Sequence, residues 1–178
     1  MKGCTIMNEI LKTIRERRSV RQFTDQPVPK DLLQQIIDAG IWAPTARNDQ
    51  NWHFIVMNNE EEIKKLYTAM GKASGRENYS FYGCKAFIVC TELLSSNLGL
   101  ANIGCAMQNM MLAVHSLGLG SVWINQLNDV GEDPDVRSLL LSWGMPEANR
   151  AWCGLAIGYP ANTPADKERK EGLVSWVE

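Results

Sequence analysis

Three arginines and a serine stand within five residues in Arg17-Arg18-Ser19-Val20-Arg21. Guanidinium groups bind phosphates and carboxylates through paired N–H donors, and a hydroxyl adds a further donor. Arg17 and Arg18 also stand at the expected end of a helix, where cations interact favourably with the helix dipole. The dipole accounts less well for Arg21, which lies beyond that end. The spacing alone leaves an anion site and a helix-end arrangement equally open.

A polar loop from Pro44 to Trp52 carries a second set of chemical groups. Its side-chain amides could hydrogen-bond a planar heterocycle that has alternating donors and acceptors, and Trp52 could form an aromatic wall. A polar surface turn leading into a strand explains the same residues more simply. The charged run 167–170 is likewise typical of a solvated face, and it gains interest only if the tail folds back toward the arginines.

Other motifs exclude several kinds of site. Gly118-Leu119-Gly120-Ser121 resembles half of a dinucleotide fingerprint, but it follows a helix, precedes a strand and lacks the third glycine. No P-loop or nucleophile elbow occurs. The five cysteines contain no C-x-x-C pair, and with two histidines they give no zinc spacing, so we expect buried, reduced thiols and no metal site.

The elements that must position these groups follow from hydrophobic periodicity. It predicts helices over 7–18, 32–42, 60–73 and 97–117, the last ended by Gly118. Asp133-Pro134 predicts a further helix start, because it combines an N-cap with proline at the first helical position. Short apolar runs predict strands at 52–57, 86–91, 121–124 and 151–157, and residues 173–177 could add another. Residues 43–51 and 74–84 have loop composition.

Length and composition predict one globular domain. The chain has 178 residues, of which 45% are hydrophobic and 21% charged. Its net charge of -2 disfavours a general nucleic-acid binder. The apolar runs are too short to span a membrane, and Glu9 and Lys12 interrupt the stretch that a signal peptide would need. We therefore expect a cytoplasmic protein with neither nucleic-acid nor membrane partners.

Taken in order, these motifs resemble the FMN-dependent nitroreductase family. The likeness begins with the basic motif 17–23 and continues through the loop 43–52 and the methionine-rich helix that ends before Gly118. It closes with Ile157-Gly158-Tyr159-Pro160 and Lys167-x-Arg169. Because it covers the chain from about Met7, we expect one FMN-binding domain over 7–178, an N-terminal extension over 1–6 and Met7 as a candidate initiator.

The resemblance implies an α+β fold, a three-layer α/β/α sandwich around a mostly antiparallel sheet. It implies a homodimer with FMN in each of two interface sites, and a C-terminal strand that could be exchanged with the partner subunit. FMN is the implied cofactor and NAD(P)H the implied hydride donor. The residues that the resemblance assigns to FMN binding are Arg17, Arg18, Ser19, Arg21, Pro44, Thr45, Ala46, Asn48, Asn78, Trp123, Ile124, Asn125, Gln126, Lys167 and Arg169.

Roles within this set also come from the resemblance. Lys167 and Arg169 would reach the FMN phosphate, and residues 44–48 would approach the flavin from the other subunit. Arg21 would lie near flavin N1 and O2, where its charge favours the reduced cofactor. No catalytic side chain is expected, because the chemistry occurs on FMN. Three features differ from the family pattern: Thr45-Ala46 replaces a frequent Ser-Ser, Asn51 replaces a common proline, and the segment 77–86 is short. The resemblance therefore supports FMN binding more strongly than it supports nitro compounds as substrates.

The implied activity is electron transfer from NAD(P)H to nitroaromatic, quinone or similar acceptors by a ping-pong mechanism. A family relative with another flavin reaction, such as dehalogenation, ene reduction or flavin destruction, is a second interpretation. A third is a non-catalytic protein that binds or stores flavin. Rapid bleaching of bound flavin by NADH or NADPH would separate the enzymes from the storage protein.

Overall fold

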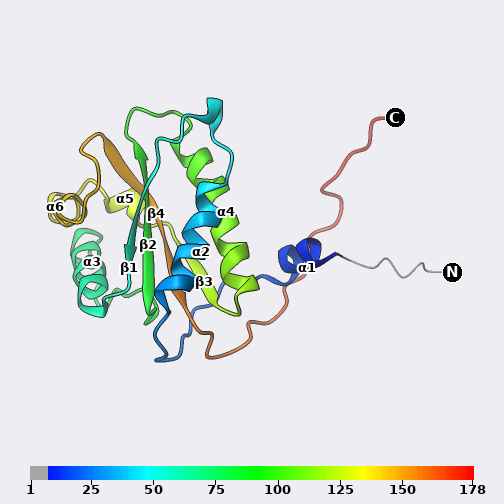
Figure 1. The fold of residues 1–178 in the computed structure, drawn as a ribbon, viewed down its shortest axis with the longest axis horizontal. Helices are drawn as coiled ribbons and strands as arrows, with labels where there is room; N and C mark the ends of the chain where they lie inside the picture. Colours follow the sequence, from blue (N-terminus) through cyan, green and yellow to red (C-terminus); the bar gives the residue numbers. More distant parts are fainter. Residues whose placement is uncertain (1–7) are drawn as a thin grey trace.

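Four antiparallel strands form the centre of the fold in the computed structural model, which describes residues 8–178 (Figure 1). The sheet order is β1-β2-β4-β3, and all three neighbouring pairs are antiparallel, as expected. The proposed N-terminal extension and Met7 lie outside the described residues. The strands are β1 (His53–Met57), β2 (Ala86–Leu93), β3 (Gly120–Ile124) and β4 (Asn149–Gly158).

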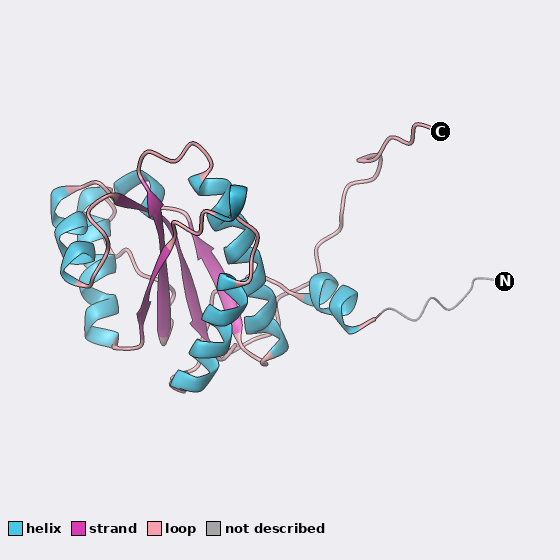
Figure 2. Cartoon of the chain, turned by 45° about the horizontal axis from the view of Figure 1, so that its top comes forward, coloured by secondary structure: helices cyan, strands magenta, loops and turns pink. Residues whose placement is uncertain are grey.

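Helices cover both faces of this sheet, which confirms the three-layer α/β/α sandwich (Figures 1 and 2). On β2, Ala86, Ile88 and Cys90 join the core beneath α2 (Lys30–Ile41) and α4 (Gly99–Ser116), while Phe87 and Val89 join the opposite core. This alternation is the period of two that a strand buried on both faces requires. The second layer consists of α3 (Glu60–Ala73), α5 (Leu127–Val130) and α6 (Pro134–Ser142), whereas α1 (Glu9–Glu16) belongs to neither layer and lies against the C-terminal half of α4.

One close contact across the sheet requires a glycine. The Phe87 ring stacks on Phe81 with centroids 4.0 Å apart and planes 8° from parallel. A Cβ added at Gly154 would lie 2.2 Å from Cζ of Phe87. The stacked pair therefore fits over β4 only because this position carries no side chain.

Several predicted boundaries are confirmed. The helix over 60–73 matches α3, and the Asp133 carboxylate accepts hydrogen bonds from the first backbone N–H groups of α6. Gly118 follows α4 with φ +75°, a left-handed conformation suited to glycine after a helix end. In residues 8–178 no helix combines the length and apolar character that a membrane crossing needs.

Other predictions differ from the structure. Helix α1 ends at Glu16, two residues before the expected end at 18. Helix α5 was not predicted, because four residues are too few for a helical periodicity to show. Residues 173–177 form no strand in this chain and instead extend from the body with exposed side chains (Figure 2).

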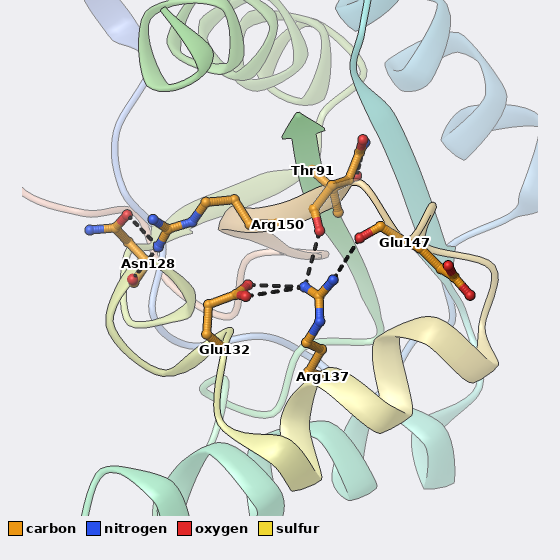
Figure 3. Close-up of polar contacts among 7 residues, drawn as sticks. Thr91, Asn128, Glu132, Arg137, Glu147 and Arg150 are labelled. Carbon is orange, nitrogen blue, oxygen red and sulfur yellow. Dashed lines mark hydrogen bonds and ion pairs between the residues drawn. The ribbon is translucent and has the colours of Figure 1, made fainter. Parts of the chain in front are cut away.

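Two arginines fasten the second helical layer to β4 (Figure 3). Arg137 on α6 pairs with the Glu132 carboxylate at 3.1 Å and donates to the backbone carbonyls of Glu147 at 2.7 Å and of Asn149, the first residue of β4, at 3.1 Å. Arg150 on β4 donates to the carbonyl of Asn128 on α5, also at 2.7 Å. These bonds hold the start of β4, where the sheet meets the first turn of α4.

Candidate functional site

The basic motif packs directly against the edge of the sheet. The backbone N–H of Val20 donates to the carbonyl of Ser121 on β3 at 2.9 Å, and Ser19 forms a parallel bridge with the same residue. Three residues on, Phe23 bridges Pro160 beyond the end of β4. The segment from α1 to α2 therefore runs beside β3, which fixes the direction of the arginines.

Two facing glycines make this close approach possible. Gly120 on β3 and Gly158 on β4 are register partners. A Cβ at Gly120 would lie 2.7 Å from the Val20 side chain, and one at Gly158 would lie 2.9 Å from the Phe23 ring. Side chains at these glycines would push the segment outward, so the glycines position the basic motif.

A cavity of about 150 Å³ lies between residues 17–21 and residues 164–169 of the C-terminal tail. Its walls combine the basic motif with the C-terminal tail, which folds back past α1 (Figure 1). The structure thus brings together six of the residues assigned to FMN, from segments more than 140 positions apart. These six are Arg17, Arg18, Ser19, Arg21, Lys167 and Arg169.

Arg17 is the cation of this cavity that most needs an anion. Burial, followed by the charges of Arg18 and Arg169, lowers the pKa of its guanidinium. Its Nη1 atom is buried and has no hydrogen-bond partner among the described residues. A half-buried charge surrounded by like charges is unfavourable unless an anion completes the site. The donors present fit a phosphate group.

Arg18 has a different role. Its Nη1 atom donates to the carbonyls of Arg15 and Arg17 at the end of α1, and its Nη2 atom pairs with Asp166 in the tail. The helix-end interpretation therefore holds for Arg18, which also ties the tail to α1. It does not account for Arg17, because α1 ends at Glu16 and the Arg17 side chain enters the cavity.

The loop that would meet the flavin lies at the other end of α4. The backbone N–H of Ala46 donates to Oδ1 of Asn102 in the first turns of that helix. His115, near the C-terminal end of α4, lines a larger cavity that shares Arg17 and Arg18 with the basic one. From Asn102 to His115 the helix rises about 20 Å. Within one chain, residues 44–48 and the basic cavity are therefore far apart.

The remaining assigned residues do not line the basic cavity. Trp123 is half-buried against the α2 and α4 layer, and Ile124 is buried at the end of β3. Asn125 is exposed and Gln126 half-buried in the turn that follows. Asn78 is exposed in the loop after α3, with φ +57°.

Two buried polar residues were not predicted. Glu92 and Asn102 are only 1% and 7% exposed, and they lie where β2 meets the first turns of α4. The available signal was a glutamate inside the apolar run of β2. Glu92 lies on a strand and Asn102 on a helix, and the hydrophobic pattern of either element says nothing about a contact between them. Only the structure shows that the two side chains meet.

These features define an α+β protein with a basic cavity at the edge of its sheet, and comparison with known proteins identifies its family. The family model described as the nitroreductase family matches residues 14–81 and 72–159. A relative from Methanothermobacter thermautotrophicus, provisionally named an NADH dehydrogenase/NAD(P)H nitroreductase, is 33% identical over 170 residues, covering 90% of this chain and 82% of its own. The chain belongs to the nitroreductase family.

A second relative and a solved structure extend this comparison. An FMN reductase [NAD(P)H] from Bacillus subtilis is 29% identical over 180 residues, which cover 92% of this chain and 70% of that protein. The crystal structure of a nitroreductase with bound FMN from Bacteroides fragilis superposes with a TM-score of 0.88 at 32% identity. That match covers 97% of this chain and 100% of the other.

Proposed function

We propose that this protein is an FMN-dependent oxidoreductase that passes electrons from NAD(P)H to nitroaromatic, quinone or similar acceptors. The basic cavity carries the proposal, because Arg17 is half-buried there and no anionic side chain of residues 8–178 pairs with it. The FMN held by the similar structure from Bacteroides fragilis supports it, as does the FMN in a nitroreductase from Desulfitobacterium hafniense, with a TM-score of 0.87 at 26% identity.

We assign distinct tasks to the residues of the cavity. Arg17, Lys167 and Arg169 would hold the phosphate, and the Ser19 hydroxyl would add a donor. Arg21 would place its positive charge beside flavin N1 and O2, where it stabilises the charge that reduction creates. When bound, FMN would supply the hydride acceptance and electron donation that side chains cannot.

We propose a homodimer in which each site combines parts of two chains. The basic cavity and the loop 44–48 lie at opposite ends of α4, so one chain cannot close both around a single FMN. In a two-fold pair whose α4 helices cross antiparallel, each basic cavity would meet the partner's loop. The site geometry therefore favours a dimer with two equivalent composite sites.

Exposed apolar side chains support the same assembly. Helix α1 buries none of its residues, although Ile10, Leu11 and Ile14 lie on it. Trp42 after α2 and Trp176 in the tail are each 86% exposed. We propose that an interface above about 2,000 Å² covers these groups, and that residues 173–177 add a strand to the partner.

We further propose that residues 7–178 act as one domain in the cytoplasm, with a ping-pong mechanism. Cys90 and Cys153 are register partners on β2 and β4 yet remain free thiols, the state that a reducing compartment maintains.

The ping-pong mechanism follows from the number of binding sites. The chain offers no second nucleotide-binding motif, so NAD(P)H and the acceptor would use one site in turn. Parallel double-reciprocal plots are expected, whereas intersecting lines would contradict a shared site.

The decisive experiment is an anaerobic absorption spectrum of the purified protein before and after NADH or NADPH. We expect a yellow protein that releases FMN, not FAD, on heating and bleaches rapidly with one of the two donors. Bound flavin that neither donor bleaches would favour a storage protein. A colourless protein that takes up no added FMN would overturn the proposal.

A further inference from the structure

A buried pair of polar side chains connects the loop 44–48 to the body of the chain. The backbone N–H of Ala46 donates to Oδ1 of Asn102 at 3.1 Å, and Nδ2 of Asn102 donates to Oε1 of Glu92 at 2.9 Å. Glu92 is on β2 and Asn102 on α4, so this chain of hydrogen bonds crosses from the sheet through the helix to the loop. The loop is thereby fixed to a strand and a helix of the core.

The chemistry of these groups allows only one orientation of the amide. A backbone N–H needs an acceptor and a carboxylate oxygen needs a donor, and an asparagine provides both. Rotating the Asn102 amide by half a turn would set its oxygen against the Glu92 carboxylate, which is two acceptors. It would also set its NH₂ group against the backbone N–H of Ala46, which is two donors. Glu92 therefore dictates which side of Asn102 faces the loop.

This contact is the one hydrogen bond that joins residues 44–48 to the rest of the described chain; farther along the loop, the carbonyl of Asn51 accepts from Nδ2 of Asn149 at 3.5 Å. Within the described chain, every other hydrogen bond of residues 44–50 stays inside the loop. Arg47 and Gln50 have φ of +57° and +49°, a left-handed conformation that is unfavourable for such side chains, and Asn48 between them has φ +58°, which asparagine tolerates better. A loop in this conformation needs an outside contact to keep its direction.

The cost of burying the Glu92 carboxylate also indicates a role other than packing. Burial of a carboxylate carries a desolvation cost that only good hydrogen bonding offsets. Glu92 is 1% exposed, and its Oε2 atom has no partner among the described residues. An apolar side chain of similar size would stabilise the core better, so packing does not explain an acid here.

We propose that Glu92 and Asn102 are positioning residues that orient residues 44–48 for FMN. The inference rests on the proposed function, because it takes this loop to contact the flavin. Glu92 fixes the amide of Asn102, and Asn102 holds the loop through Ala46. Neither side chain needs to touch the cofactor.

The test measures the dissociation constant of FMN by fluorescence titration of the FMN-free protein. Asn102→Asp keeps the acceptor for Ala46 but sets a carboxylate against Glu92, so we expect binding about 3- to 10-fold weaker. Adding Glu92→Gln should restore binding, since the exchange moves the carboxylate and the amide to each other's positions without changing the net charge. Glu92→Gln alone should stay near the parent, because its amide oxygen still accepts from Asn102.

Asn109→Ala is the matched control. Asn109 lies on the same helix and donates its side-chain amide to the carbonyl of Ala39 on α2 at 3.1 Å. This variant should lower the melting temperature of the FMN-free protein without weakening FMN binding. Asn102→Ala provides a second loss-of-contact variant if Asn102→Asp fails to fold.

The outcomes separate the inference from the proposed function. Unchanged FMN binding in Asn102→Asp, failure of the exchange to restore it, or equal weakening in Asn109→Ala would overturn the inference and leave the proposed function standing. A parent protein that binds no FMN would overturn both. Weakened binding that the exchange restores supports the inference.

Discussion

Arg17 and Arg18 are neighbours with the same side chain, yet the structure uses them differently. Both terminal nitrogens of Arg18 are paired, with carbonyls and with Asp166, and only its Nε lacks a partner among the described residues, whereas Arg17 has a terminal nitrogen, Nη1, that is buried and unpaired there. We expect Arg17→Ala and Arg169→Ala each to weaken FMN binding by about 1–3 kcal/mol, because a charge-assisted hydrogen bond is lost. Arg15→Ala, which removes an exposed arginine of α1, should bind FMN like the parent in the same titration. Equal loss in all three variants would indicate a general charge effect.

The repulsion around Arg17 also predicts a response to simple anions. Because Arg18 and Arg169 disfavour its charged state, an anion in the cavity should relieve that repulsion. Inorganic phosphate should therefore raise the melting temperature of the FMN-free parent more than that of Arg17→Ala. The comparison is made at constant ionic strength, with chloride as the reference. An identical phosphate response in both proteins would argue against a phosphate site at Arg17.

The Cys84 thiol predicts a dependence of stability on alkaline pH. Burial raises its pKa to about 12, whereas the unfolded chain has the ordinary value near 9. Below pH 9 both states are protonated, and above it only the unfolded state ionises, so this contribution is lost as pH rises toward 12. At pH 10 the loss should be about 1.4 kcal/mol. Urea unfolding under reducing conditions at pH 8 and pH 10 should show a smaller decrease for Cys84→Ala. Equal decreases would contradict this assignment.

At the scale of elements, the contact between the basic motif and β3 depends on an absent side chain. Gly120→Ala would place a Cβ 2.7 Å from Val20, so the segment 19–21 must move outward. We expect a loss of stability of about 1–3 kcal/mol together with weaker FMN binding. Adding Val20→Gly removes the Val20 Cβ, which would lie 2.8 Å from the new side chain, together with both methyl groups, and should recover FMN binding even if overall stability stays low. Failure to recover would mean that Gly120 matters through the sheet alone.

Sequence periodicity predicted the elements better than the contacts between them. Each long helix and each buried strand was predicted, because apolar spacing reports the face that an element buries. Helix α5 was too short for this signal, and α1 ends at Glu16, two residues before the predicted end. The pair Glu92 and Asn102 was not predicted, since a contact between a strand and a helix leaves no periodic trace. The cluster of Arg17 with Arg169 followed from family resemblance and not from spacing.

At the scale of the whole molecule, the proposed composite site predicts that one chain alone cannot enclose FMN. Residues 17–21 and 164–169 build the basic cavity at one end of α4, and the loop 44–48 is held at the other end. The apolar faces of α1 and the tail lie outside both cores. Light scattering should therefore show a dimer that holds FMN, and a monomer that retains FMN would contradict the composite site.

Mixed dimers give the sharpest test of this arrangement. Two tagged chains, one with Asn48→Ala and the other with Arg169→Ala, are co-expressed and purified through both tags. If each site combines one chain's arginines with its partner's loop, one site in the mixed dimer is intact and the other carries both changes. FMN titration should then reveal one site of parental affinity per mixed dimer, and none in either homodimeric variant. If each loop served its own chain, both sites would carry one change, and no site of parental affinity would appear.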